Sequence, residues 1–163
     1  MTSAFLQSLD APAREVLAVE QPTWLAGLRA RAASRFAEIG LPTTRDEDWK
    51  FTSVAAIGQG TFAIPEPGSY STDIASGVQE FRAKAPDWYE VVYLNGRYAP
   101  HLSRGDLPPG VRVLSMADAF LQEQDLLQAR LGAVADYQYQ AFTALNTALM
   151  SDGAVRGAAF HAA

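Results

Sequence analysis

Three adjacent carboxylates form the densest group of side chains that could bind a divalent cation or exchange a proton: Asp46, Glu47 and Asp48. Consecutive residues of a helix point in different directions, so the three cannot converge on one ion from a single helix. Thr44 followed three residues later by Glu47 is the pattern of a capping box, in which both side chains satisfy free backbone amides. The segment therefore predicts a short helix that begins near Arg45, with its acidic residues in the first turn.

The remaining candidates for chemistry are isolated. His101 follows a proline in a predicted loop and His161 lies in an alanine-rich tail, whereas a zinc site needs three or four ligands. Ser151-Asp152 is predicted to end a helix and has no nucleophile motif around it. Residues 58–60 lack the lysine and the spacing of a phosphate-binding loop. We therefore assign no catalytic, cofactor-binding or metal-binding residue, and we expect no bound cofactor.

Composition excludes further functions. The 163 residues include no cysteine, so this chain alone can form no disulfide and no cysteine-ligated zinc or iron–sulfur cluster. A formal net charge of -5 argues against nucleic acid or an anionic membrane as a partner. Residues 1–10 carry no basic side chain, and no uncharged stretch is long and apolar enough to span a bilayer. These features predict a soluble, cytoplasmic protein.

Hydrophobic periodicity predicts the helices that carry these residues. Residues 3–17 predict one kinked helix or two short ones. A clearer helix starts around Pro22 and stops at Gly40, with an apolar stripe facing the core. The polar face of this helix is predicted to carry Arg29, Arg31, Arg35 and Glu38. Residues 57–76 predict a long loop, residues 74–84 a weak helix and residues 137–150 the last helix. Three tryptophans are interpreted as core or domain-contact anchors: Trp24, Trp49 and Trp88.

The strongest local signal is a β-hairpin at residues 89–99. Asn95-Gly96 lies between two apolar runs and is the preferred pair for a type I′ turn, since both positions need a positive φ. Residues 111–114 predict a third strand, after which Ser115 caps a further helix. The fold class is therefore α+β, mainly helical with a small hairpin or three-strand element. The predicted division is a helical segment 1–56, a linker 57–76, a region 77–155 and a tail 156–163.

Three segments resemble the N-terminal part of the SufD proteins of the SUF iron–sulfur cluster assembly system. They are residues 24–53, which contain Leu-Pro-Thr-Thr-Arg-Asp-Glu-Asp-Trp-Lys-Phe-Thr-Ser, residues 91–100, which read Val-Val-Tyr-Leu-Asn-Gly-Arg-Tyr-Ala-Pro, and residues 141–154. The resemblance implies a helical N-terminal domain followed by a long β-helix and a helical C-terminal segment. It also implies SufB and the ATPase SufC as partners of the full-length family protein.

The resemblance covers about residues 20–155, roughly the first third of a family member, and stops where the β-helix would begin. A truncated gene, a frameshifted copy or the end of an expressed fragment would each explain the unmatched tail. The histidine implicated in cluster chemistry lies late in the family's β-helix, and neither His101 nor His161 occupies a matching position, so no site residue is transferred.

Three functional hypotheses follow. The first is the N-terminal domain of a SufD-like scaffold or accessory protein that is not an enzyme. On this hypothesis the main docking regions for SufB and SufC are absent from this chain. The second is a stand-alone protein–protein interaction module that self-associates through exposed apolar surface. The third is a small hydrolase or metal-dependent enzyme.

Overall fold

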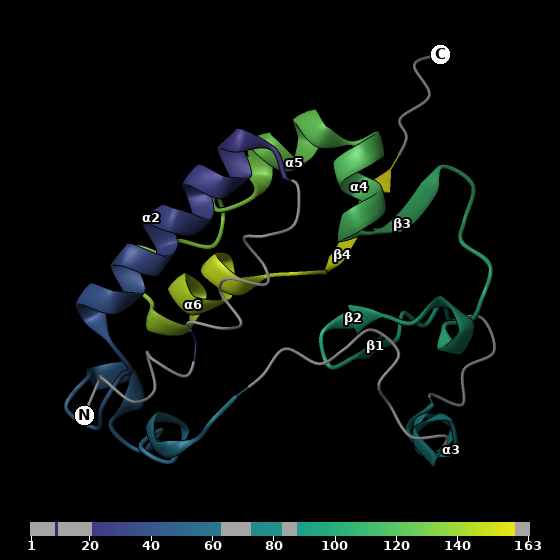
Figure 1. Ribbon diagram of the computed structural model, residues 1–163. Coiled ribbons are helices and arrows are strands. Elements are labelled where there is room, and N and C mark those ends of the chain that lie inside the picture. The colour runs from purple at the N-terminus through teal and green to yellow at the C-terminus, as the bar shows by residue number, and fades with distance from the viewer. Residues whose placement is uncertain (1–8, 10–20, 63–72, 83–87, 159–163) are drawn as a thin grey trace. The chain divides into compact units, whose positions relative to one another are not determined.

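The computed structural model describes residue 9 and residues 21–62, 73–82 and 88–158. The chain divides into two compact units that interleave along the sequence (Figure 1). Unit 1 comprises residues 1–64 and 125–150, and unit 2 comprises residues 65–124 and 151–163. The helix or helices predicted at residues 3–17 lie outside the described residues. Helices and two small antiparallel sheets confirm the predicted α+β class.

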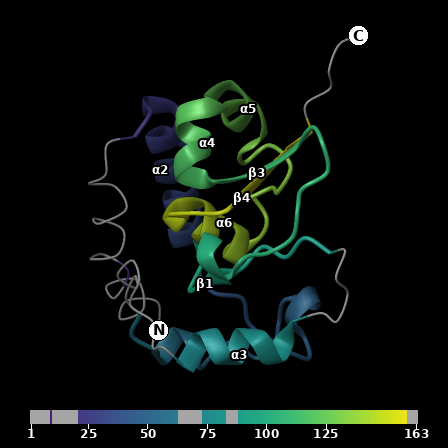
Figure 2. The same cartoon turned by 90° about the vertical axis from the view of Figure 1, so that its right-hand side faces the viewer.

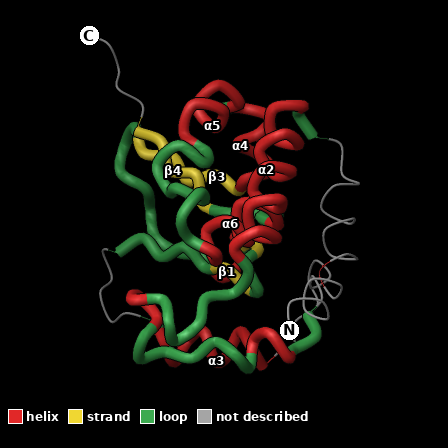
Figure 3. The backbone as a smooth tube through the Cα atoms, turned by 90° about the vertical axis from the view of Figure 1, so that its left-hand side faces the viewer, coloured by secondary structure: helices red, strands yellow, loops and turns green. Residues whose placement is uncertain are grey.

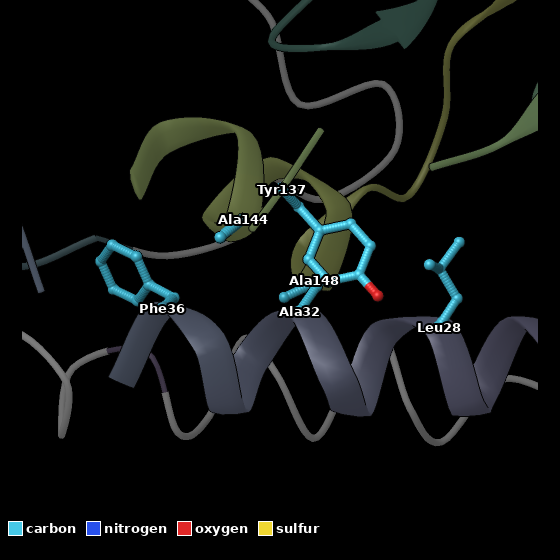
Figure 4. Packing of buried hydrophobic residues seen from close by; sticks show 6 residues of the cluster. All are labelled: Leu28, Ala32, Phe36, Tyr137, Ala144 and Ala148. Carbon is cyan, nitrogen blue, oxygen red and sulfur yellow. The ribbon is translucent and has the colours of Figure 1, made fainter. Parts of the chain in front are cut away.

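Unit 1 is built around two packed helices, α2 (Thr23–Ile39) and α6 (Ala141–Leu149). The buried residues of α2 recur at helical spacing, as the sequence predicted, because one stripe of the helix faces α6. Ala32 and Ala144 are fully buried, and their small side chains let the two backbones come close. Figure 4 shows the cluster that fills this contact: Leu28, Ala32, Phe36, Tyr137, Ala144 and Ala148.

Both ends of α2 lie where the sequence predicted them, but one residue of its predicted polar face is buried. Pro22 precedes the first turn, and Gly40 ends the helix at a φ of 68°. Arg29 was predicted on the exposed face and is instead 6% exposed. Its guanidinium donates to the side chain of Gln21 at 2.6 Å and to the carbonyl of Met150 at 2.5 Å. Arg29 thus caps the C-terminus of α6, where helix carbonyls lack intrahelical donors.

The other elements of unit 1 are short. Two 3₁₀ turns, η1 (Glu47–Trp49) and η2 (Ile57–Gln59), shape the segment after α2. Helix α5 (Gln124–Arg130), most of which belongs to unit 1, is followed by Gly132 at a φ of 73°. A Cβ at Gly132 would lie 2.9 Å from the end of the Leu28 side chain, and the positive φ favours glycine there. The last helix was predicted from Tyr137 and begins at Ala141, because Tyr137 is buried in a turn that precedes it.

Unit 2 begins with helix α3 (Asp73–Phe81) and the hairpin strands β1 (Tyr93–Leu94) and β2 (Arg97–Tyr98). Asn95 and Gly96 have φ angles of 49° and 79°, which confirms the predicted type I′ turn. The 3₁₀ turn η3 (Pro100–Leu102) follows the hairpin. The hairpin strands pair antiparallel, with Tyr93 opposite Tyr98.

A second sheet completes unit 2. Strand β3 (Val111–Ser115) was predicted, and it leads into helix α4 (Met116–Gln122). The Ser115 hydroxyl accepts from the amide of Asp118 at 3.0 Å, which confirms the predicted cap. Strand β3 lies beside β4 (Ala154–Ala158) (Figure 3). The two strands pair antiparallel, with Val111 opposite Ala158. The sequence did not predict β4, because an alanine- and glycine-rich segment has little strand propensity of its own.

Candidate functional site

The carboxylate of Asp152 joins three parts of unit 2. Its Oδ2 accepts from the amide of Tyr98 at 2.7 Å, and its Oδ1 accepts from the amides of Met116 at 2.9 Å and Gly153 at 2.8 Å. Strand β2, the start of α4 and the start of β4 therefore meet at one side chain. We call this arrangement the Asp152 junction. From sequence, Ser151-Asp152 was predicted only to end the preceding helix, and the long-range contacts were missed.

Local structure explains why these amides need an acceptor. Met116 is the first residue of α4, and its amide has no partner within the helix. Tyr98 occupies a non-hydrogen-bonded position of the hairpin, so its amide points away from β1. A carboxylate satisfies both donors at once and makes strong, charge-assisted hydrogen bonds. The Asp152 junction therefore fixes the hairpin relative to the second sheet within unit 2.

Three tyrosines accompany the junction: Tyr89, Tyr93 and Tyr98. The rings of Tyr93 and Tyr98 have centroids 5.6 Å apart, and a hydrogen bond with Tyr98 raises the pKa of Tyr89. Burial, reinforced by the charge of Asp152, raises the pKa of Tyr93 to about 12. Its buried hydroxyl has no hydrogen-bond partner in the described part of the chain. The raised pKa values keep the phenols of Tyr89 and Tyr93 protonated at neutral pH, so neither of the two can act as a base or a nucleophile there.

A second polar cluster lies at the end of α3. Glu90 forms a salt bridge with Arg104, whose Nη2 lies 2.9 Å from its Oε1, and a looser one with Arg82 at 3.5 Å. Arg82 also donates to the carbonyl of Leu102. The cluster attaches α3 to the segment that follows the hairpin. With its single carboxylate already held by two arginines, it offers no free acid or base.

The acidic triplet lies at a 3₁₀ turn and not in the helix that the sequence predicted. The Asp46 carboxylate accepts from the Thr43 amide at 2.7 Å and from its hydroxyl at 3.1 Å, and these bonds lower the pKa of Asp46. The Thr43 hydroxyl accepts from the Arg45 amide. The predicted capping box of Thr44 and Glu47 is therefore wrong, and a 3₁₀ turn stands where we expected a helix. Among the described residues, no group of three His, Cys, Asp or Glu could hold a metal ion.

The remaining predicted residues are dispersed. His101 lies exposed in η3, and His161 lies outside the described residues. Trp24 packs against the core of unit 1, and Trp49 contacts Phe142 with ring centroids 5.2 Å apart. Both confirm the interpretation as anchors. Trp88 does not, because it is 64% exposed. Gly58 is the middle residue of η2 and Gly60 follows its last residue; Gly58 lies close to Leu41 and Gly60 close to Phe62, and the segment forms a 3₁₀ turn rather than a phosphate loop.

Unit 1 thus has an apolar helical core, and unit 2 combines helices and two small sheets around a polar junction. The match to the family model for the N-terminal region of SufBD proteins extends over residues 3–156. The chain therefore belongs to the SufB/SufD family, as its motifs indicated, and the family is one of iron–sulfur cluster assembly.

One curated relative supports this assignment. An iron–sulfur cluster assembly SufBD family protein of Synechocystis sp. is 31% identical over 132 residues. The aligned region covers 80% of this chain and 28% of the relative, so the chain spans little more than a quarter of the relative's length. No solved structure matches the chain. None of the described helices is both long enough and apolar enough to cross a bilayer.

Proposed function

We propose that this chain acts as the non-catalytic N-terminal domain of a SufD-type scaffold protein in iron–sulfur cluster assembly. The observation that carries the proposal is the family match over residues 3–156. The cluster is cargo of the assembly on this proposal. A chain without cysteine supplies no thiolate ligand to it, so its contribution comes from its shape and its contacts.

The state of the polar groups supports a non-catalytic role. Asp46 is engaged by Thr43 and Asp152 by three backbone amides, so these two carboxylates serve local structure. Glu90 holds two arginines. In each case, a general acid or base would have to give up contacts that hold a turn or a junction together.

The finer assignments remain predictions from the sequence. They are SufD rather than SufB, the cytoplasm as the compartment, and SufB and SufC as partners of the complete assembly. Since the family's main docking regions lie in the β-helix and the C-terminal segment, we expect SufC not to co-purify with residues 1–163. Co-purification of the two at equal stoichiometry would contradict this part of the proposal.

A chimera tests the proposal. The matched N-terminal region of the Synechocystis relative is replaced by this chain, and the fusion is expressed in a strain that lacks the relative. We expect the fusion to restore the activity of iron–sulfur enzymes. The controls are a fusion with Asp152→Ala and a protein without any N-terminal region. Equal rescue by the protein without an N-terminal region would exclude a role for this domain in cluster assembly.

A stand-alone interaction module is the second candidate, and exposed aromatic side chains favour it. Phe51 is 93% exposed and Tyr139 is 83% exposed, although both lie in ordered turns of unit 1. Exposed aromatic residues are typical anchors of protein–protein contacts. In this case the chain would bind a partner with the same affinity whether or not it is fused to the rest of a family protein.

A further inference from the structure

The two edges of the hairpin in unit 2 differ. In an antiparallel pair, every second residue turns its backbone N–H and C=O away from the partner strand. On the β2 edge, the outward amide of Tyr98 is satisfied by Asp152. On the β1 side, the backbone of Glu90 forms hydrogen bonds inward, with the backbone of Arg104. The backbone of Val92 also bonds inward, with the amide of Ala99 and the hydroxyl of Ser103. The outward residues of this edge are therefore Val91 and Tyr93.

The backbone groups of Val91 and Tyr93 have no hydrogen-bond partner within the described residues. The hairpin is a two-stranded sheet, and no described strand pairs with this edge. An unpaired edge of this kind is a template for another strand. Charged residues usually protect such edges, but between Tyr89 and Leu94 only Glu90 is charged, and it is occupied by Arg82 and Arg104.

The open edge lines an apolar groove. The opposite wall is one face of α3, and the groove of about 620 Å³ is lined there by Ile74, Gly77, Val78 and Phe81. Figure 2 shows α3 and β1, and Arg82 fixes the end of the helix through Glu90 and Leu102. A Cβ added at Gly77 would meet no atom within 4 Å, so the missing side chain leaves open space in this wall. Phe81 is 91% exposed.

We propose that the same strand of a second copy of this chain occupies the edge, antiparallel and centred on Val92. In this register Val91 lies opposite Tyr93 of the other copy, and Tyr93 lies opposite its Val91. Both are hydrogen-bonded pairs, so every open backbone group of the two residues is satisfied on both strands. The edge is therefore self-complementary, as a two-fold interface requires.

The charge pattern of the strand favours this register. Glu90 lies opposite Leu94 of the second copy, so no like charges meet across the pairing. A register centred on Glu90 would place two carboxylates opposite each other and is disfavoured. The apolar residues of α3 and the exposed Phe81 become covered as the second strand enters the groove. This surface goes beyond the proposed function, since it depends on neither a cluster nor another SUF protein.

The contact is small. A stable interface buries about 800 Å² per partner, and one strand pair with an adjoining helix face supplies less. We therefore expect a weak dimer with a dissociation constant on the order of tens of micromolar. Analytical ultracentrifugation of the 163-residue chain over a wide concentration range measures this constant, and amide hydrogen exchange at Val91 and Tyr93 locates the interface. Both amides should exchange at least tenfold more slowly at high protein concentration.

Two variants test the edge and the groove separately. Val91→Pro removes one outward N–H and leaves the inward hydrogen bonds of the hairpin in place, as prolines at strand edges do. Its matched control is Val91→Thr, which keeps both the N–H and the β-branched side chain. Gly77→Leu fills the groove without touching the strand, and it favours the helical state of α3. We expect Val91→Pro and Gly77→Leu each to weaken dimerisation at least tenfold, and Val91→Thr to leave it unchanged.

Three results would overturn the proposal. The first is a chain that stays monomeric at every concentration, which would leave the edge to a strand of another protein. The second is a dimer in which the amides of Val91 and Tyr93 exchange as fast as in the monomer. The third is a dimer that forms equally well in folded Val91→Pro and Gly77→Leu variants, because the interface would then lie elsewhere on the chain.

Discussion

Unit 1 and unit 2 bury different kinds of groups. In unit 1 the buried positions are mostly apolar side chains of α2 and α6, and Leu25, Leu28 and Phe36 are among the larger ones. In unit 2 fewer apolar side chains are buried within the described residues, and Ala99 and Ala119 among them are small. Its elements meet at Asp152 and Glu90 instead. A small apolar core needs polar contacts with satisfied partners to fix the arrangement of short strands.

We expect the largest loss of stability from a substitution in the apolar core of unit 1. Phe36→Ala removes a buried aromatic ring and leaves a cavity between α2 and α6, so we expect a loss of about 3–5 kcal/mol in the free energy of unfolding. Urea denaturation measures the loss. Phe51→Ala is the matched control, since Phe51 is 93% exposed and its removal should change stability by less than about 0.5 kcal/mol. Equal losses in both variants would show that burial in unit 1 does not determine its stability.

The second prediction concerns the Asp152 junction. Asp152→Ala leaves the amides of Tyr98 and Met116 without their acceptor, and we expect a loss of about 2–4 kcal/mol. Asp152→Asn keeps one oxygen but turns an amide donor toward a backbone donor, so its loss should be smaller yet clear. Thermal unfolding followed by circular dichroism measures both. Asp106→Ala, at an exposed aspartate of the same unit, serves as the control. If the Asp152→Ala protein were as stable as this control, the hydrogen bonds of Asp152 would not hold unit 2 together, and the proposed difference between the two units would be wrong.

The third prediction is smaller and separates two neighbouring threonines of unit 1. Thr43→Ala breaks the hydrogen bond from the Thr43 hydroxyl to Asp46 and the one from the Arg45 amide, and should cause a small but measurable loss in the free energy of unfolding. Thr44→Ala should cost almost nothing, since the described hydrogen bonds of this turn do not use its side chain. Chemical denaturation of the two variants decides between this turn and the capping box that the sequence suggested. A larger loss for Thr44→Ala would restore the capping box.

The two units also differ in how far sequence could predict them. Local rules sufficed for Gly40 at the end of α2, for the Asn95-Gly96 turn and for the Ser115 cap, because each depends on residues within one turn of chain. The role of Asp152 could not be predicted in this way. Its partners Tyr98 and Met116 lie 54 and 36 positions away, and only the folded arrangement brings their amides to one carboxylate.

Arg29 and β4 teach the same lesson. Arg29 has the residue type and the spacing of a solvent-facing position, yet it caps α6 across the core of unit 1. Strand β4 exists because β3 offers it hydrogen bonds, although its own residues are poor strand formers. Short-range patterns therefore predict where elements start and stop, whereas the long-range polar contacts that hold unit 2 together remain hidden from them.

The last effect concerns the tyrosines of unit 2, and it is absent at neutral pH and appears only at alkaline pH. The pKa of Tyr93 is about 12 in the folded chain, above the value of about 10 for an unperturbed tyrosine. The folded state therefore keeps this proton where the unfolded state loses it. The stabilisation is complete below about pH 10 and is lost as pH rises through about 12.

Tyrosinate absorbance across an alkaline titration measures this directly. Tyr93→Phe should remove the component that titrates last, and the variant should lose less stability above about pH 10 than the unmodified chain. Tyr139→Phe is the control, because Tyr139 is 83% exposed in unit 1 and its loss should leave the late component in place. If Tyr93→Phe left that component unchanged, burial of a phenol beside Asp152 could not be its cause. The polar character of unit 2 would then rest on the hydrogen bonds of Asp152 and Glu90 alone.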